Sequence, residues 1–259
     1  MARFSLVGWF QSVVWHSRRS PRKRRPARRV LSFDALEDRM VLSTLTVTSA
    51  ADDGSAGTLR AVLAAASPGD TVVFDRSLGG KTIALKLGQL SVTRSLDIEG
   101  PGAGRLTVSG SAASRVFDVG NGATVTIAGL TVANGAVTGD ESDSLHLGGG
   151  GILNEAGATL TLSHVTVSNN TATAATDTVD VFGGGLLNEG HATVVSCTFS
   201  GNQALGGGGT SFFGGSVGGS IDNYGGATLT ATGSTFTGNK QGNRIKVSPE
   251  YQTSRISSR

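Results

Sequence analysis

The sequence of 259 residues carries 39 glycines, and aromatic residues make up only 5% of it. A composition rich in glycine, β-branched and small polar residues favours short strands and tight turns, and it excludes a long helical bundle. No run approaches the ~20 apolar residues that a transmembrane helix needs, so none is predicted. The single cysteine, Cys197, excludes an intrachain disulfide.

The formal net charge of +3 is unevenly distributed along the chain. Residues 1–40 contain ten Lys or Arg and three acidic residues, whereas residues 116–239 contain nine Asp or Glu and no Lys or Arg. The excess of basic over acidic residues therefore lies at the two ends of the chain. It does not predict binding to nucleic acid.

Residues 1–43 are predicted to form a basic, largely disordered targeting segment. The apolar stretch FSLVGWFQSVVW (residues 4–15) is similar to the hydrophobic part of a signal peptide. The basic run SRRSPRKRRPARR (residues 17–29) follows that stretch, however, where a signal peptide would place it before. Like charges and prolines also favour plain disorder, so these residues alone leave both interpretations open.

The segment FDALEDRMVLS (residues 33–43) follows the basic run directly. It resembles the LEPR-type sorting segment of planctomycete surface and secreted proteins, where a basic stretch precedes a motif of the form F-E-x-L-E-x-R-x-L-L. Asp38 stands where that motif often has Pro, and Val41 replaces one Leu. The resemblance implies a bacterial protein that is extracellular or lies at the cell surface or outer membrane.

A short helix is predicted over residues 57–66, ended by the sequence Ser-Pro-Gly at residues 67–69. A solenoid exposes strand edges and apolar core at its first coil, so a covering helix is expected there. The sequence LTVTSAADDGSAGTLRAVLAAASPGDTVVFD (residues 45–75) resembles the N-terminal cap of bacterial secreted β-helix proteins of the Cys-Ser-Leu-Arg-Glu-Ala-Ile type. Leu59, Arg60, Ala61 and Val62 stand at the corresponding place.

Three segments in the second half of the chain repeat one another, with spacers of variable length. They are GGGILNEAGATLTLSHVTVSNN (149–170), GGGLLNEGHATVVSCTFSGN (183–202) and GGSIDNYGGATLTATGSTFTGN (218–239). Each unit contains three short strand-like runs, which indicate the three faces of one solenoid coil. Weaker strand-like runs continue the pattern upstream, at residues 71–74, 81–85, 96–99, 106–109, 116–119, 124–127 and 130–132.

The sequence therefore predicts an all-β fold, a right-handed parallel β-helix over residues 44–239 with a short N-terminal capping helix. A β-sandwich or propeller is the main competing fold. The repeats also resemble those of chlamydial polymorphic outer-membrane proteins, in the elements Gly-Gly-apolar-apolar-Asn and Phe-x-Gly-Asn. That resemblance implies a secreted or surface-exposed adhesin.

Two asparagines recur at fixed places in each repeat unit and are predicted to form structural ladders along the solenoid. Stacked amides bond to one another along such an axis, and Asn tolerates the left-handed backbone of a corner. One column is spaced by 34 and 35 residues and the other by 32 and 37 residues. The columns are Asn154, Asn188 and Asn223, and Asn170, Asn202 and Asn239. Cys197 aligns with inward-facing positions and is predicted to be a buried small hydrophobe.

No catalytic residue is predicted. A pectate lyase needs a basic residue beside calcium-binding carboxylates, but residues 116–239 offer no Lys or Arg. A glycoside hydrolase needs two facing carboxylates, whereas Asp52 with Asp53 and the other acid groups lie in Gly-, Ser- or Thr-rich stretches. A weak calcium site is the one metal hypothesis, and no other cofactor is expected. Its candidate ligands are Asp140, Glu141, Asp143, Asp177 and Asp180.

These observations predict a non-catalytic protein that is exported or located at the cell surface, adhesin-like or structural. The alternative is a polysaccharide-active enzyme that uses acidic residues on the β-helix. Extracellular glycans or surface proteins are the expected partners. Three loops, at residues 136–147, 171–182 and 204–217, are expected to present a variable surface to them. Residues 240–259 are predicted to be a polar disordered tail. The last coil would then lack a cap, so self-association through it is expected.

Overall fold

The structure, a computed structural model, describes residues 42–139, 148–175, 181–206, 216–241 and 256–257. The predicted targeting segment lies outside these residues except for its last two. Strands form about half of the described chain, and they pair in parallel throughout. The prediction of an all-β solenoid of parallel strands is confirmed at this level.

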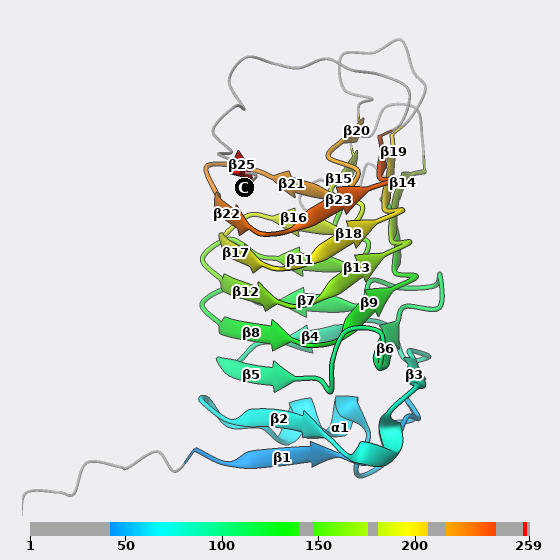
Figure 1. The fold of residues 1–259 in the computed structure, drawn as a ribbon, viewed down its shortest axis with the longest axis vertical. Helices are drawn as coiled ribbons and strands as arrows, with labels where there is room; N and C mark the ends of the chain where they lie inside the picture. The colour runs from blue at the N-terminus through cyan, green and yellow to red at the C-terminus, as the bar shows by residue number, and fades with distance from the viewer. Residues whose placement is uncertain (1–41, 140–147, 176–180, 207–215, 242–255, 258–259) are drawn as a thin grey trace, which may run out of the picture. The chain divides into compact units, whose positions relative to one another are not determined.

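The first sheet contains eight strands, ordered along the stack as they follow in the chain (Figure 1). Its strands are β1 (Thr44–Val47), β2 (Thr71–Phe74), β5 (Leu96–Glu99), β8 (Thr124–Ala128), β12 (Thr159–Ser163), β17 (His191–Val195), β22 (Thr228–Thr232) and β25 (Ile256–Ser257). Successive strands are joined in register, so Thr161 lies between Thr126 and Thr193. Each coil is thus stacked on the one before it.

Two further sheets complete the wall around the main core. The second sheet consists of β3 (Lys81–Ala84), β6 (Leu106–Ser109), β9 (Thr131–Ala133), β13 (Thr166–Ser168), β18 (Thr198–Ser200) and β23 (Thr235–Thr237). The third sheet consists of β4 (Leu90–Val92), β7 (Phe117–Val119), β11 (Ile152–Asn154), β16 (Leu186–Asn188) and β21 (Ile221–Asn223). The upstream strand predictions are confirmed to within about a residue, but β4 was missed.

The prediction of loops at residues 136–147, 171–182 and 204–217 is corrected in part, because each of these segments contains strand residues. A fourth sheet is formed by β10 (Ala136–Gly139), β14 (Thr171–Ala174), β19 (Gln203–Leu205) and β24 (Lys240–Gln241), and a fifth by β15 (Val181–Phe182) and β20 (Ser216–Val217). The fourth and fifth sheets share a small core of Ala172, Val181 and Ala204, all fully buried. Small alternating side chains let the backbone of these segments pair with its equivalent in the next coil.

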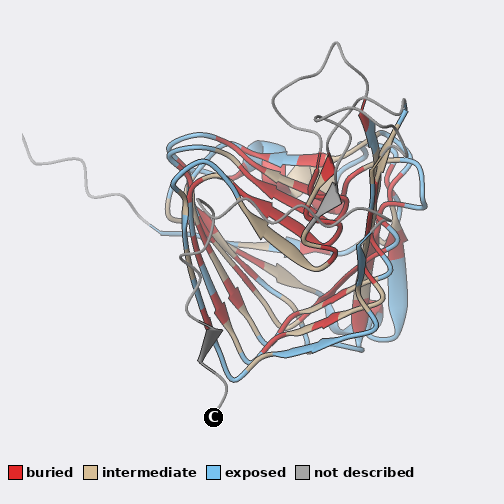
Figure 2. Cartoon of the chain, turned by 90° about the horizontal axis from the view of Figure 1, so that it is seen from above, coloured by how far each residue is buried: buried red, intermediate tan, exposed pale blue. Residues whose placement is uncertain are grey.

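The main core consists of aliphatic residues on every second position of the strands, stacked from coil to coil. Figure 2 shows buried residues gathered along the strands, with exposed ones mostly between them. Val167 and Phe199, for example, are paired in register and fully buried. Corners of the coils hold residues with positive φ, since the chain turns sharply there. At the corner between the first and second sheets these residues are Gly129, His164, Ser196 and Gly233.

A helix forms where the sequence predicted one, as α1 (Leu59–Ala65), and it lies beside β1 at the N-terminal end of the stack (Figure 1). Thr58 caps the helix by accepting a hydrogen bond from the Ala61 N–H, and Leu59 and Leu63 face the core. A short 3₁₀ helix, η1 (Arg76–Leu78), follows β2.

The predicted tail was wrong in two places. Lys240 and Gln241 form β24, because Lys240 follows Asn239 as Thr171 follows Asn170, and its N–H donates to the Asn202 carbonyl over 2.8 Å. Ile256 and Ser257 form β25, which pairs with the outer edge of β22. The repeat therefore does not end at Asn239, and the edge of the first sheet is partly covered.

Candidate functional site

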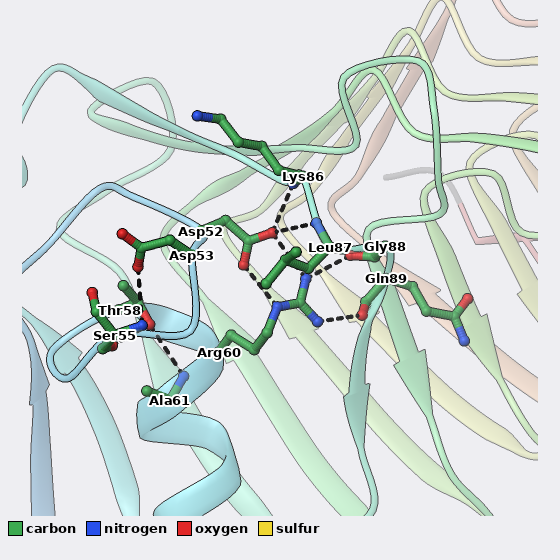
Figure 3. Close-up of polar contacts among 10 residues, drawn as sticks. All are labelled: Asp52, Asp53, Ser55, Thr58, Arg60, Ala61, Lys86, Leu87, Gly88 and Gln89. Atoms are coloured by element: carbon green, nitrogen blue, oxygen red, sulfur yellow. Dashed lines mark hydrogen bonds and ion pairs between the residues drawn. The ribbon is translucent and has the colours of Figure 1, made fainter.

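Arg60 holds together the N-terminal end of the solenoid (Figure 3). Its guanidinium forms a bidentate pair with Asp52, Nε to Oδ1 over 2.7 Å and Nη2 to Oδ2 over 3.0 Å. It also donates to the carbonyl oxygens of Gly88 over 2.6 Å and Gln89 over 2.9 Å. The helix α1 is thereby tied to the loop that precedes β4. This Arg60–Asp52 clamp is the most concentrated polar contact near the cap.

The carboxylate of Asp52 is buried and fully engaged. Burial alone would raise its pKa, but hydrogen bonds from Arg60 and from the Leu87 and Lys86 N–H groups lower it to about 2. Asp53 points away from the clamp in Figure 3 and accepts a hydrogen bond from the Ser55 N–H. The two adjacent acids do not face a common point, so the geometry of a glycosidase pair is absent from this part of the described chain.

A second polar chain joins neighbouring coils beside the clamp. Arg115, 8% exposed, donates from Nε to the Gly149 carbonyl over 3.0 Å and from Nη2 to the Gly148 carbonyl over 2.9 Å. Its Nη1 reaches Gln89 Oε1 over 2.9 Å, and Gln89 Nε2 donates to Asp118 over 2.8 Å. Sequence reasoning missed this chain, although a lone arginine before a strand was a signal for it.

The hollow beside α1 is too small for an organic ligand. It measures about 190 Å³, and ligand sites usually occupy ~300 Å³ or more. Its walls are Arg60, Leu63, Ala64, Gln89, Leu90 and Ser91. The Arg60 guanidinium that borders it is already bonded to Asp52.

Within each of the two predicted asparagine columns, side-chain hydrogen bonds join the residues of successive coils. Asn154 Nδ2 donates to Asn188 Oδ1 over 2.7 Å, and Asn188 Nδ2 donates to Asn223 Oδ1 over 2.6 Å. In the other column Asn202 Nδ2 donates to Asn239 Oδ1 over 3.0 Å. Four of these residues are fully buried: Asn154, Asn170, Asn188 and Asn202. Their amides therefore bond one coil to the next.

The first column begins abruptly at Asn154. Its Oδ1 is buried with no hydrogen-bond partner in the described part of the chain. The residue in register with Asn154 in the preceding coil is Val119, which has no side-chain donor. By contrast Asn170 Oδ1 accepts a hydrogen bond from the Gly135 N–H over 2.7 Å. A backbone donor therefore satisfies the first side chain of the second column.

Cys197 is buried in the core, 1% exposed, as the repeat alignment predicted. Burial raises the pKa of its thiol, which favours the protonated, unreactive form. Its Sγ accepts a hydrogen bond from the Val165 N–H over 3.4 Å. The residue packs as a small apolar side chain.

One unusual carboxyl group lies in the last coils. Asp222 lies on the third sheet, where it is paired in register with Leu187 of the preceding coil. Burial raises the pKa of Asp222 to about 6. Nearby in sequence, Tyr224 is 40% exposed and packs against Phe182 with 5.1 Å between ring centroids. A carboxyl group with a pKa of about 6, two residues in sequence from an exposed ring, is the arrangement that most resembles a reactive site.

The predicted calcium ligands Asp140, Glu141, Asp143, Asp177 and Asp180 lie outside the described residues. Within residues that the structure does describe, no three His, Cys, Asp or Glu side chains are grouped as a metal would require. Nor does that part of the chain contain a helix of the length and apolarity needed to cross a membrane.

The fold defines a class of protein, the parallel β-solenoid with an N-terminal helical cap. Comparison with protein-family models, with curated proteins and with solved structures finds no match for the chain.

Proposed function

We propose that this chain is an exported right-handed parallel β-helix that acts as a non-catalytic surface or structural protein, adhesin-like in its use of an extended stack. The parallel strands of successive coils support the β-helix, and connections between parallel strands are right-handed in ~98% of cases. The sorting-type segment at residues 33–43 supports export.

One observation carries the proposal: buried polar groups in the described chain are used to hold the backbone together. The fully buried asparagines bond coil to coil, Asp52 is saturated by Arg60 and two N–H groups, and Arg115 spans two turns of the chain. Buried polar groups are costly unless bonded, and here their bonds stabilise the contacts between successive coils, as a structural role requires.

Two measurements test the proposal. Residues 1–43 fused to a reporter should direct it out of the cytoplasm of a planctomycete host, and scrambling residues 33–43 should abolish this. The full chain should bind whole cells or their glycans without converting polygalacturonate or neutral glycans. Retention of the fused reporter in the cytoplasm overturns export, and glycan turnover overturns the non-catalytic assignment.

A polysaccharide-active enzyme is the second candidate, favoured by the raised pKa of Asp222 and by the exposed ring of Tyr224 two residues further along the chain. A carboxyl group that is protonated near neutrality can serve as a general acid, and an exposed ring can stack on a sugar. Turnover of any glycan that disappears in Asp222→Asn would establish this candidate in place of the first.

A further inference from the structure

The first sheet carries a regular outward-facing array on four consecutive strands, β8, β12, β17 and β22. The first and third residues of each strand face outward, because the second and fourth contribute to the core or pack against it. Strand pairing places these residues in two straight columns. The columns are Thr124, Thr159, His191 and Thr228, and Thr126, Thr161, Thr193 and Thr230. Seven of the eight positions are therefore threonine; we call this set the threonine array.

The threonine array is periodic in two directions. Neighbouring positions in a column are ~4.8 Å apart, and the two positions on one strand are separated by ~6.8 Å. Figure 1 shows the four strands one above another on the same side of the stack. A threonine side chain has few χ1 choices in a strand, so each hydroxyl and methyl group is held in a repeated orientation. Such regularity is not needed for solubility alone.

The chemistry of the array limits what it could bind. None of the eight positions carries an Asp, Glu, Lys or Arg side chain, and the next strand, β5, places Asp97 and Glu99 at the border. An uncharged occupant therefore matches the array better than an ion or a charged polymer. The array also offers no Phe, Tyr or Trp ring, which recognition of sugar faces commonly uses.

We propose that the threonine array binds the surface of ice. Hexagonal ice repeats its oxygen atoms in two directions at intervals comparable to those of the array. Each hydroxyl can donate one hydrogen bond and accept two, so it can take the place of a lattice water. The methyl groups between the hydroxyls order first-shell water without competing for its hydrogen bonds. The array is independent of the function proposed above and does not depend on export.

His191 is the one irregular position in the array. Its Nδ1 is 2.7 Å from Thr228 Oγ1, so the ring engages a hydroxyl that the array would otherwise present. The imidazole is also wider than a threonine side chain and interrupts the first column. His191→Thr would complete the first column and should strengthen ice binding.

The test uses the purified full chain and four single variants, one of which is His191→Thr. Thr161→Lys and Thr193→Lys place a charged, long side chain within the array. Thr93→Lys is the control, because Thr93 is exposed and lies between β4 and β5, outside the array. Circular dichroism and thermal unfolding establish that each variant is folded. Ice growth is then followed by thermal hysteresis, crystal shape and partition of the labelled protein into a growing ice front.

The wild-type chain should shape ice crystals and enter the ice, Thr161→Lys and Thr193→Lys should lose both properties, and Thr93→Lys should keep them. His191→Thr should increase thermal hysteresis. A folded wild-type chain that leaves ice growth unchanged overturns the proposal. So does a folded Thr93→Lys variant that loses activity as fully as Thr161→Lys, because binding would then not reside in the array.

Discussion

Asn170 donates its side-chain amide to Oδ1 of Asn202, 32 residues further along the chain, over 2.9 Å. The same Oδ1 accepts the backbone N–H of Asn170 over 3.1 Å. Asn202 in turn donates to the Val167 carbonyl over 2.9 Å and to Asn239. One fully buried side chain thus serves four hydrogen bonds and connects three coils.

Asn202→Ala should lower the free energy of unfolding by about 2–4 kcal/mol, because it strands several buried partners at once. Denaturation by urea, followed by circular dichroism, measures the change. The matched control is Asn121→Ala, since Asn121 is exposed, and it should change stability by less than about 0.5 kcal/mol. Equal effects of the two substitutions on the free energy of unfolding would show that the ladder hydrogen bonds add no stability beyond that of an exposed asparagine.

Asp52→Asn should weaken the cap in a pH-dependent way. The pKa of Asp52 falls from an ordinary 3.8 to about 2 in the folded state, since burial is outweighed by the bonds from Arg60, Leu87 and Lys86. The carboxylate therefore stabilises the fold above about pH 4, and about 2 kcal/mol of that stability is lost as pH falls toward 2. Urea titrations at pH 7, 4 and 2.5 should show this loss in the wild type and its absence in the variant. Parallel pH curves for the two proteins would contradict the assignment.

Asp222→Asn should act in the opposite direction. Burial raises the pKa of Asp222 from 3.8 to about 6, so the folded chain prefers the protonated form. Stability is therefore greatest below the unfolded value and falls as pH rises through about 6. The variant should exceed the wild type by about 1–3 kcal/mol at pH 7.5, with the lower end expected because the side chain is half-buried. Urea titrations at pH 4.0 and 7.5 decide it: a variant no more stable at pH 7.5 than the wild type refutes the prediction.

Ser196→Gly should stabilise the corner between the first and second sheets. Ser196 has a φ of 52°, and glycine already stands at the equivalent corner in two coils, as Gly129 and Gly233. Relief of the left-handed strain should outweigh the added freedom of the unfolded chain by about 0.5–1 kcal/mol. Ser200→Gly, within β18, is the control and should destabilise by a similar amount. Thermal unfolding distinguishes the two, and a fall in Tm for Ser196→Gly would be the contrary result.

Phe236→Ser should reduce self-association through the last coil. Phe236 is 37% exposed, whereas Phe199, stacked against it in the preceding coil with 5.3 Å between ring centroids, is fully buried. Apolar surface of this kind favours contact with another chain. Light scattering over a concentration series should give a rising mass for the wild type and a lower one for Phe236→Ser. Tyr224→Ser, also at an exposed ring, is the control, and a wild type that remains a monomer at all concentrations would rule out association.

Repetition made much of the fold predictable from the sequence. The spacing of Asn154 and Asn188 indicated one coil, and apolar alternation placed Val167, Cys197 and Phe199 in the core. These signals are strong because every coil must match its neighbour, so the same residue pattern recurs in several coils of one chain.

The fourth sheet and the clamp escaped prediction for different reasons. Segments such as Thr171–Ala174 are short and carry only small side chains, so their strands arise from backbone pairing that leaves little trace in hydrophobicity. Their one regular signal is that β14, β19 and β24 each begin directly after an asparagine of the second column. The partners of Arg60 include carbonyl oxygens 28 and 29 residues away, which no side-chain pattern can reveal.

Each coil of this chain finds its neighbours about one repeat back in the sequence, beginning from α1 and β1. A chain delivered from its N-terminus can therefore lay down one coil at a time on a finished template, without waiting for distant segments to emerge. Loop closure over one repeat is entropically modest and does not grow as the stack lengthens. Assembly of a chain that emerges from its N-terminus would thus proceed coil by coil, and each completed coil would oppose backward sliding of the chain.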